Sequence, residues 1–197
     1  SPYSANVTIS DINEDADPTG DTVTTLLTAL FNDIDDIQGS SGGSSANALK
    51  GIILTHNTAL DTQGSWQYAI SDGAGGFGTW QSVPESSQND DSISTLFVAA
   101  ADKVRFLPFA DWNGTVGVVS YLVVDDAGTT TITSSGSFSG STTANDISVA
   151  SYTITLNDVT AINDAPVAGN ATSSTIDEDN QTSDGDTITT LFSTSSL

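Results

Sequence analysis

The sequence predicts an all-β protein, an elaborated β-sandwich that carries one short helix. Its 25 acidic residues are 22 Asp and three Glu, and Asp is a poor helix former that favours caps and turns. Short segments rich in β-branched and aromatic residues recur through the middle of the chain. They are separated by turn sequences, a pattern that is typical of strands.

Eight segments have this strand-like composition. They are residues 50–56, 65–71, 78–83, 94–99, 103–108, 117–124, 129–134 and 147–156. In the last segment, apolar residues from Val149 to Leu156 alternate with Ser and Thr. Alternation of this kind is typical of a strand with one buried face.

One segment has helical spacing instead. Over residues 22–33, apolar side chains recur on one helical face, after Asp21 as a possible N-cap. They are Val23, Leu26, Leu27, Leu30 and Phe31. We therefore expect a short helix here, followed by a flexible loop over the Gly- and Ser-rich residues 39–48.

The two ends of the chain resemble each other. When residues 1–15 are set over residues 165–179, identical residues share one offset of 164, and six of them support a repeat. They are Pro2, Asn6, Thr8, Ile12, Glu14 and Asp15, which match Pro166, Asn170, Thr172, Ile176, Glu178 and Asp179. After a one-residue insertion, DTVTTLL at 21–27 also matches DTITTLF at 186–192. Residues 1–165 are therefore predicted to form a complete repeat, and residues 166–197 the N-terminal part of the next.

The chain is strongly acidic, with 25 Asp and Glu against three Lys and Arg and a formal net charge of −22. This balance excludes nucleic acid and anionic lipid as general partners, because neutralising phosphates needs Lys and Arg. It favours bound cations, and a solvated acidic surface is the alternative.

The absence of Cys excludes disulfides, thiolate zinc sites and a thiol nucleophile. No stretch of the sequence approaches the roughly 20 apolar residues that a membrane-spanning helix needs. The first residues do not form a signal peptide, so we expect a piece of a longer protein.

Asp and Asn gather around the boundary between the two predicted repeats. Calcium takes about six to eight oxygen ligands from carboxylates, amides and backbone carbonyls on flexible loops. The sequence therefore predicts a calcium (Ca2+) site at this joint, built from acids that leave one repeat and acids that enter the next. The expected ligands are Asp158, Asn163, Asp164, Glu178 and Asp179, and the first copy carries Glu14 and Asp15 at the same start position. Ordinary turn and cap residues are the alternative.

Catalysis is not expected from this sequence. Paired carboxylates can hydrolyse glycosides, and Asp125 with Asp126 is a nominal pair, but neighbouring strand residues point to opposite faces of a sheet. The one His, His56, is expected at the rim of a strand. No motif of a nucleophilic, phosphate-binding or histidine-metal site occurs in the sequence.

Aromatic residues offer a ligand site as an alternative to core packing. A hairpin that turns Trp66 and Trp80 inward is expected around the Gly-rich residues 72–78. Phe77 and Trp112 lie in predicted turns. Exposed beside acids, these two rings would form a calcium-assisted site for a sugar or a peptide.

Two stretches of the sequence carry a family resemblance, VRFLPFADWNGTVGVVSYLVVDDAGTTTIT and SYTITLNDVTAINDAPVAGN. They resemble the cadherin-like tandem repeats of giant bacterial repeats-in-toxin (RTX) adhesins. Those repeats have a Pro-x-x-Asp-aromatic-Asn-Gly-Thr turn, which Pro108 to Thr115 match here. They also have a Tyr-containing strand that ends in Asp-Gly, and here Tyr121 is followed by DDAG at 125–128. The closing Asn-Asp-Ala-Pro of the family is matched at 163–166.

The resemblance implies an Ig/cadherin-like β-sandwich with calcium between successive domains and Asp126 among the metal ligands. It also implies display outside the cell after type I secretion, as a stalk module that extends and rigidifies an adhesin in cell adhesion and biofilm formation. The expected partners are neighbouring repeats of the same chain. The alternative is a calcium-dependent module of the same kind of adhesin that binds a host or surface glycan or peptide. Neither expectation includes a nucleic acid partner or membrane insertion.

Overall fold

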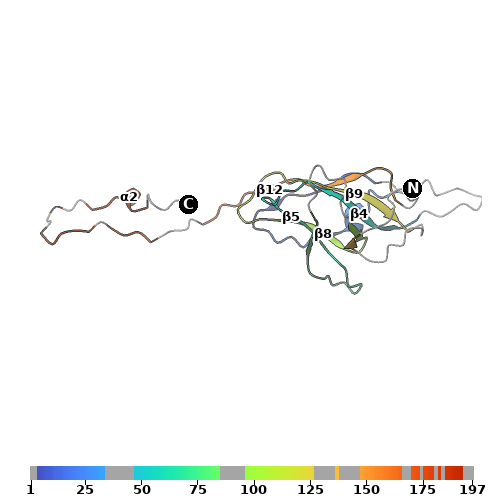
Figure 1. Cartoon of the computed structure of the whole chain (residues 1–197), viewed down its shortest axis with the longest axis horizontal. Helices are drawn as coiled ribbons and strands as arrows, with labels where there is room; N and C mark the ends of the chain where they lie inside the picture. The colour runs from blue at the N-terminus through green and yellow to red at the C-terminus, as the bar shows by residue number, and fades with distance from the viewer. Residues whose placement is uncertain are drawn as a thin grey trace, which may run out of the picture. The chain divides into compact units, whose positions relative to one another are not determined.

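The computed structural model describes most of the chain, which divides into two compact units, Ser1–Ile162 and Asn163–Leu197 (Figure 1). The described residues are 4–33, 47–84, 96–126, 136–137, 147–165, 170–173, 175–179, 182 and 185–192. The expected strand at 129–134 and most of the expected loop at 39–48 lie outside them. The division between the units falls three residues before the predicted end of the repeat at 165.

The first unit contains a six-stranded sheet in the order β1-β11-β9-β4-β7-β10. Its strands are β1 (Val7–Ile9), β11 (Tyr152–Leu156), β9 (Val119–Asp125), β4 (Leu49–Asn57), β7 (Leu96–Ala99) and β10 (Gly136–Ser137). β1 pairs with β11 in parallel, and the other neighbours pair antiparallel. β4 and β9 form the longest ladder of the unit, in the middle of the sheet.

A second, four-stranded antiparallel sheet has the order β3-β8-β5-β6. Its strands are β3 (Asp21–Thr22), β8 (Lys103–Pro108), β5 (Gly64–Ala69) and β6 (Gln81–Ser82). A small parallel pair joins β2 (Ile12–Asn13) to β12 (Val159–Thr160), and Figure 1 shows β12 at one end of the first unit. Strands thus make up most of the regular secondary structure in the described part of the chain, and the predicted all-β class is confirmed.

One hydrophobic core is shared by the two large sheets. Trp66 of β5 is fully buried, packs edge-on against Phe106 with ring centroids 5.4 Å apart, and donates through Nε1 to the Gly117 carbonyl at 2.9 Å. Trp66 therefore faces inward as expected. The expectation for Trp80 was wrong, because its ring is only half-buried and lies against the guanidinium of Arg105.

Tyr121 of β9 is fully buried in the same core, beside Tyr152. Its hydroxyl donates to the Ala5 carbonyl at 2.7 Å, which ties the first segment of the chain to the sheet. Burial raises the pKa of Tyr121 above its usual value of 10.0, and the hydrogen bond with Ser4 partly offsets this effect.

The predicted helix is much shorter than expected. Helix α1 covers only Val23–Leu27, with the Thr22 hydroxyl accepting from the Thr25 N–H at 3.1 Å as the N-cap. Asp21 is not the cap, because it pairs with Val104 in the second sheet. Three of the five helical residues are Val or Thr, which are weak helix formers. Consequently the segment after α1 continues as a turn.

In the second unit, helix α2 covers Ile188–Phe192. These five residues are the ones that the repeat alignment pairs with Val23–Leu27 of α1. Ile176 and Ile188 are 61% and 76% exposed.

Val149 does not take part in the expected strand alternation, and its side chain is 93% exposed. The strand does not begin until Tyr152, and residues before it turn. There the Ser148 hydroxyl accepts from the Val123 N–H and donates to the Ala150 carbonyl. This local hydrogen bonding replaces a strand ladder, and alternation of side chains holds only from Tyr152 onward.

Candidate metal site at one end of the first unit

A buried carboxylate organises the end of the first unit at which β2 and β12 pair. Glu14 is 4% exposed. One of its oxygens, Oε1, accepts from the Ile162 N–H at 2.7 Å, and Oε2 accepts from Asn113 Nδ2 at 3.1 Å. Its own N–H donates to the Thr160 carbonyl at 3.1 Å. Glu14 therefore ties together three segments that are far apart in the sequence.

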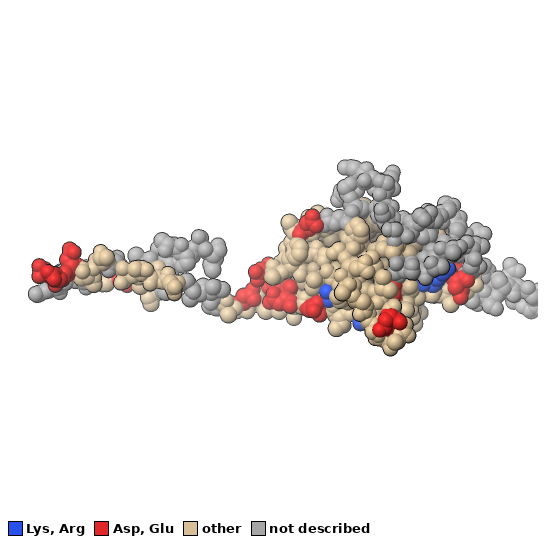
Figure 2. Space-filling model, turned by 60° about the horizontal axis from the view of Figure 1, so that its bottom comes forward, with Lys and Arg blue, Asp and Glu red and all other residues tan. Residues whose placement is uncertain are grey.

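Two exposed acids lie on the segments that Glu14 joins. Asp15 follows Glu14 directly, and Asp111 precedes Asn113 by two residues. Their carboxylate oxygens lie within 4.8 Å of each other. Two negative charges at this separation repel by about 1 kcal/mol even in bulk water. Acidic side chains gather on the surface at this end of the unit (Figure 2).

The backbone places Asp111 in an unusual conformation. Asp111 has φ 62, the only described non-Gly residue with positive φ, and Asp tolerates this left-handed region better than most residues. The turn is closed by the Trp112 N–H, which donates to the Phe109 carbonyl at 3.2 Å. Gly114 then exchanges two hydrogen bonds with Val159 of β12, at 2.9 and 3.1 Å. The turn that carries Asp111 is thus held against β12, the strand that leads to the end of the first unit.

Only some of the predicted calcium ligands lie at this end of the first unit. Glu14 and Asp15 lie at this site. Asp158 directly precedes β12 and is half-buried, and its buried Oδ1 meets no hydrogen-bond donor among the residues that the structure describes. Asn163 and Asp164 open the second unit, where Asn163 Nδ2 donates to the Asp164 carbonyl at 3.5 Å. Asp111 was not among the ligands that the sequence predicted.

The remaining predicted ligands lie elsewhere. Asp126 directly follows β9, where its Oδ1 accepts from the Ala48 N–H at 2.7 Å just before β4 begins. It therefore fastens the entry into β4. Glu178 and Asp179 lie in the second unit and are exposed.

Of the two predicted ligand-binding aromatics, one is exposed and one is not. Trp112 is partly buried and packs against the main core. Phe77 is 37% exposed, and the ammonium of Lys103 lies 4.6 Å from its ring centroid.

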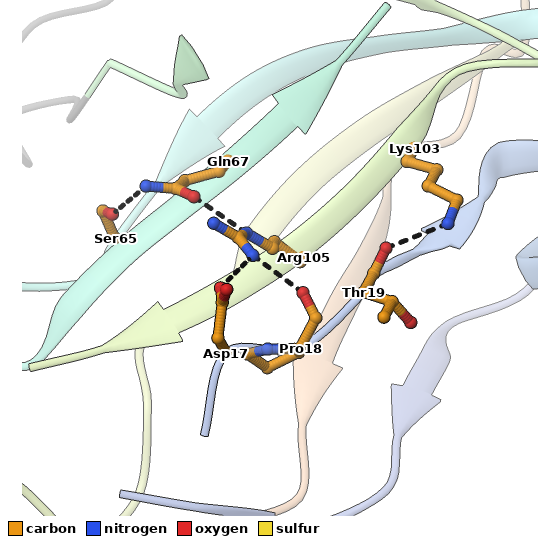
Figure 3. Close-up of polar contacts among 7 residues, drawn as sticks. All are labelled: Asp17, Pro18, Thr19, Ser65, Gln67, Lys103 and Arg105. Carbon is orange, nitrogen blue, oxygen red and sulfur yellow. Dashed lines mark hydrogen bonds and ion pairs between the residues drawn. The ribbon is translucent and has the colours of Figure 1, made fainter. Parts of the chain in front are cut away.

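Two basic residues of β8 hold the segment that follows Asp15 (Figure 3). Arg105 donates from Nη1 to the Asp17 carboxylate and to the Pro18 carbonyl, the latter at 2.8 Å. Its Nε donates to Gln67 Oε1 at 2.8 Å. Lys103 donates from Nζ to the Thr19 carbonyl at 3.0 Å. The segment that bears Asp15 is thus restrained by Glu14 before it and by these cations after it.

Comparisons of the chain with models of known protein families, with curated proteins and with solved structures return no match. Neither helix in the described part of the chain has the length and apolar character needed to cross a membrane.

Proposed function

We propose that the first unit is an Ig/cadherin-like, calcium-binding module of a large bacterial surface adhesin, which extends and rigidifies the adhesin's stalk outside the cell. The observation that carries this proposal is the exposed pair Asp15 and Asp111, held within 4.8 Å by a framework centred on buried Glu14. An ion that neutralises both carboxylates relieves their repulsion and fixes their segments in place.

The chemistry of the donors favours calcium. All the candidate donors at this end are oxygens, with carboxylates the main ones, and the sequence has no Cys and one His, which lies on β4. Hard oxygen donors on loops suit calcium better than zinc or copper. The buried Oδ1 of Asp158 also needs a cation or a donor, because an unsatisfied buried oxygen is costly. Both oxygens of Glu14 accept hydrogen bonds, so its main contribution is to position the others.

Asp164 extends this ligand set by chain connectivity. Its neighbour two residues earlier, Ile162, is bound to Glu14 through its N–H. Two residues of extended chain span at most about 7 Å, so the length of the chain allows an ion bound near Glu14 to recruit the Asp164 carboxylate. A calcium ion that recruits Asp164 would join the first unit to the start of the next repeat and restrict the hinge between them.

Under this proposal, the Glu-Asp pair at the start of each repeat binds metal together with the end of its own repeat, not with the end of the preceding one. Glu14 and Asp15 lie at the end of the first unit where β12 also lies, close to the point at which the chain leaves this unit. By the repeat alignment, Glu178 and Asp179 then serve the exit end of the following repeat rather than this joint. Each joint would use the start and the end of one repeat together with the first residues after it.

The test is small-angle scattering of the whole 197-residue chain in calcium and in chelator. Calcium should narrow the distribution of distances between the two units, because the hinge at Asn163 becomes part of a metal site. The double variant Asp15→Asn with Asp111→Asn should scatter in calcium as the wild type does in chelator. Identical wild-type profiles in calcium and in chelator would overturn the stalk function.

A ligand-binding module is the second candidate function. Exposed Phe77 favours it, because this ring borders a hollow that also contains two of the chain's three basic residues.

A further inference from the structure

The hollow beside Phe77 has a volume of about 290 Å³. Its walls are formed by residues 17–19, by Phe77, Gly78 and Trp80, and by the β8 residues Lys103 and Arg105. It is slightly smaller than the pockets of about 300–1,000 Å³ that hold drug-sized molecules. Its size therefore suits one compact group, such as a single sugar residue or amino-acid side chain.

The hollow concentrates positive charge in a chain whose net charge is −22. Lys103 and Arg105 are two apart on β8, so their side chains leave the same face of the strand. Each cation lies against an aromatic ring, with Lys103 Nζ 4.6 Å from the Phe77 centroid and Arg105 Cζ 4.1 Å from the Trp80 centroid. The third cation, Lys50, lies on β4 in the other sheet.

Both cations have N–H donors beyond those that bond to the described residues. The Arg105 side chain is 8% exposed, and its Nε and Nη1 donate to groups of the protein. Among the described residues, none accepts from its Nη2. Lys103 Nζ carries three donors, and one of them goes to the Thr19 carbonyl. A guanidinium group that is this deeply buried gains from an acceptor that enters the hollow.

The other walls provide a different chemistry. The Asp17 side chain is 83% exposed although one of its oxygens accepts from Arg105, so the rest of the carboxylate can accept from hydroxyl groups. Phe77 presents 37% of its surface to solvent and can cover an apolar ring face. The hollow thus combines spare cationic donors, a hydroxyl acceptor and an aromatic surface.

We propose that this hollow binds a uronic acid residue of an acidic glycan. The sugar carboxylate accepts from Lys103 Nζ and Arg105 Nη2, a sugar hydroxyl donates to Asp17, and the C–H face of the ring lies on Phe77. An acidic peptide satisfies the cations too, but it lacks the hydroxyl groups that suit Asp17. This assignment rests on the ligand-binding candidate function and is independent of the calcium site.

The affinity for one sugar should be low. A monosaccharide has few atoms with which to offset its loss of freedom, so we expect a dissociation constant on the order of 1 mM. The acidic remainder of the protein repels the ligand, and at about 0.15 M salt screening beyond about 8 Å reduces this repulsion.

The test is a titration of the whole chain with galacturonate, followed by amide chemical shifts in NMR, in chelator and about 0.15 M salt. Shifts should concentrate at residues 17–19, 77–80 and 103–105. Galactose, which lacks the carboxylate, should bind at least about tenfold more weakly, the scale expected when a charged hydrogen-bonded pair is lost. Because chelator is present, the result does not depend on whether the calcium site exists.

Two variants separate this site from general electrostatics. Lys103→Gln should weaken galacturonate binding at least about tenfold, whereas Lys50→Gln, with the same change in net charge, should leave it unchanged. Phe77→Ser should also weaken binding without lowering the melting temperature, because Phe77 lies outside the core. Equal binding by the two lysine variants, or equal binding of galacturonate and galactose, would overturn the proposal. An aspartate whose two termini are blocked carries a carboxylate but no sugar hydroxyl groups. If it binds more tightly than galacturonate, the sugar assignment is overturned.

Discussion

Replacing Glu14 by Gln tests the buried carboxylate that organises the acidic end. Gln has the same shape, but it keeps one acceptor and turns an amide N–H2 toward the other donor. Glu14 accepts from Ile162 at 2.7 Å and from Asn113 at 3.1 Å, so one of these bonds is lost and a buried donor is left unsatisfied. The expected loss is about 2–3 kcal/mol of unfolding free energy. For a unit of this size, that loss lowers the melting temperature by about 4–12 °C.

The assay is thermal unfolding in chelator, followed by circular dichroism, with Glu178→Gln as the matched control. Glu178 is the equivalent residue of the second copy and is exposed, so its substitution should change stability by less than about 0.5 kcal/mol. Calcium titration of the Glu14→Gln variant should also show weakened binding, since Asp15 and Asp111 lose their common support. Equal melting temperatures for the two variants would refute the role assigned to Glu14.

Three further predictions address the site and the core. Asp111→Asn should stabilise the chain in chelator by up to about 1 kcal/mol, because it removes the repulsion between the Asp15 and Asp111 carboxylates. Calorimetry should also show that calcium no longer raises the melting temperature of this variant. The control is Asp72→Asn, which keeps its acceptor oxygen in an exposed turn and should have the stability and the calcium response of the wild type. Gly51→Ala should cost about 1–3 kcal/mol or more in chemical unfolding, because its Cβ would lie 2.4 Å from the Val98 carbonyl oxygen; an unchanged midpoint would contradict the packing between β4 and β7. Burial raises the folded pKa of Tyr121, so its stabilising effect is complete below its unfolded pKa of about 10 and is lost as pH rises through the folded value. Tyr121→Phe should therefore lose less stability than the wild type above about pH 10, and equal slopes of stability against pH would contradict this.

Much of the fold follows from strand composition, because β4, β5, β8 and β9 are rich in β-branched and aromatic residues and lie close to their predicted ranges. The errors occur where local hydrogen bonds compete with periodicity. Thr22 caps α1 in place of Asp21, which joins a sheet, and the helix ends at Leu27, six residues before the expected end at 33. At Val149, a turn held by the Ser148 hydroxyl interrupts the expected alternation. Such competition depends on tertiary partners that a hydropathy pattern does not contain.

Only part of the candidate metal site could be predicted from the sequence. The repeat alignment identified Glu14 and Asp15, because a shared offset singles out acids at equivalent starts. Asp111 lies 96 residues from Asp15 in the sequence, and tertiary contacts bring the two together, namely the pairing of Gly114 with Val159 and the hydrogen bond from Asn113 to Glu14. The sequence identified Asp111 as a turn residue, but it did not indicate that Asp15 lies beside it. The hollow between Phe77 and Lys103 also depends on contacts between separate strands and loops.

The proposed calcium site at the Asp15–Asp111 end of the first unit can be tested by isothermal titration calorimetry of the whole chain. We predict saturable calcium binding that is lost in the double variant Asp15→Asn with Asp111→Asn and retained in Asp72→Asn. At a calcium concentration about 100-fold above the dissociation constant, binding should stabilise the fold by about 2.7 kcal/mol per site. Absence of binding heat with equal melting temperatures in calcium and chelator, or wild-type affinity in the double variant, would contradict the claim.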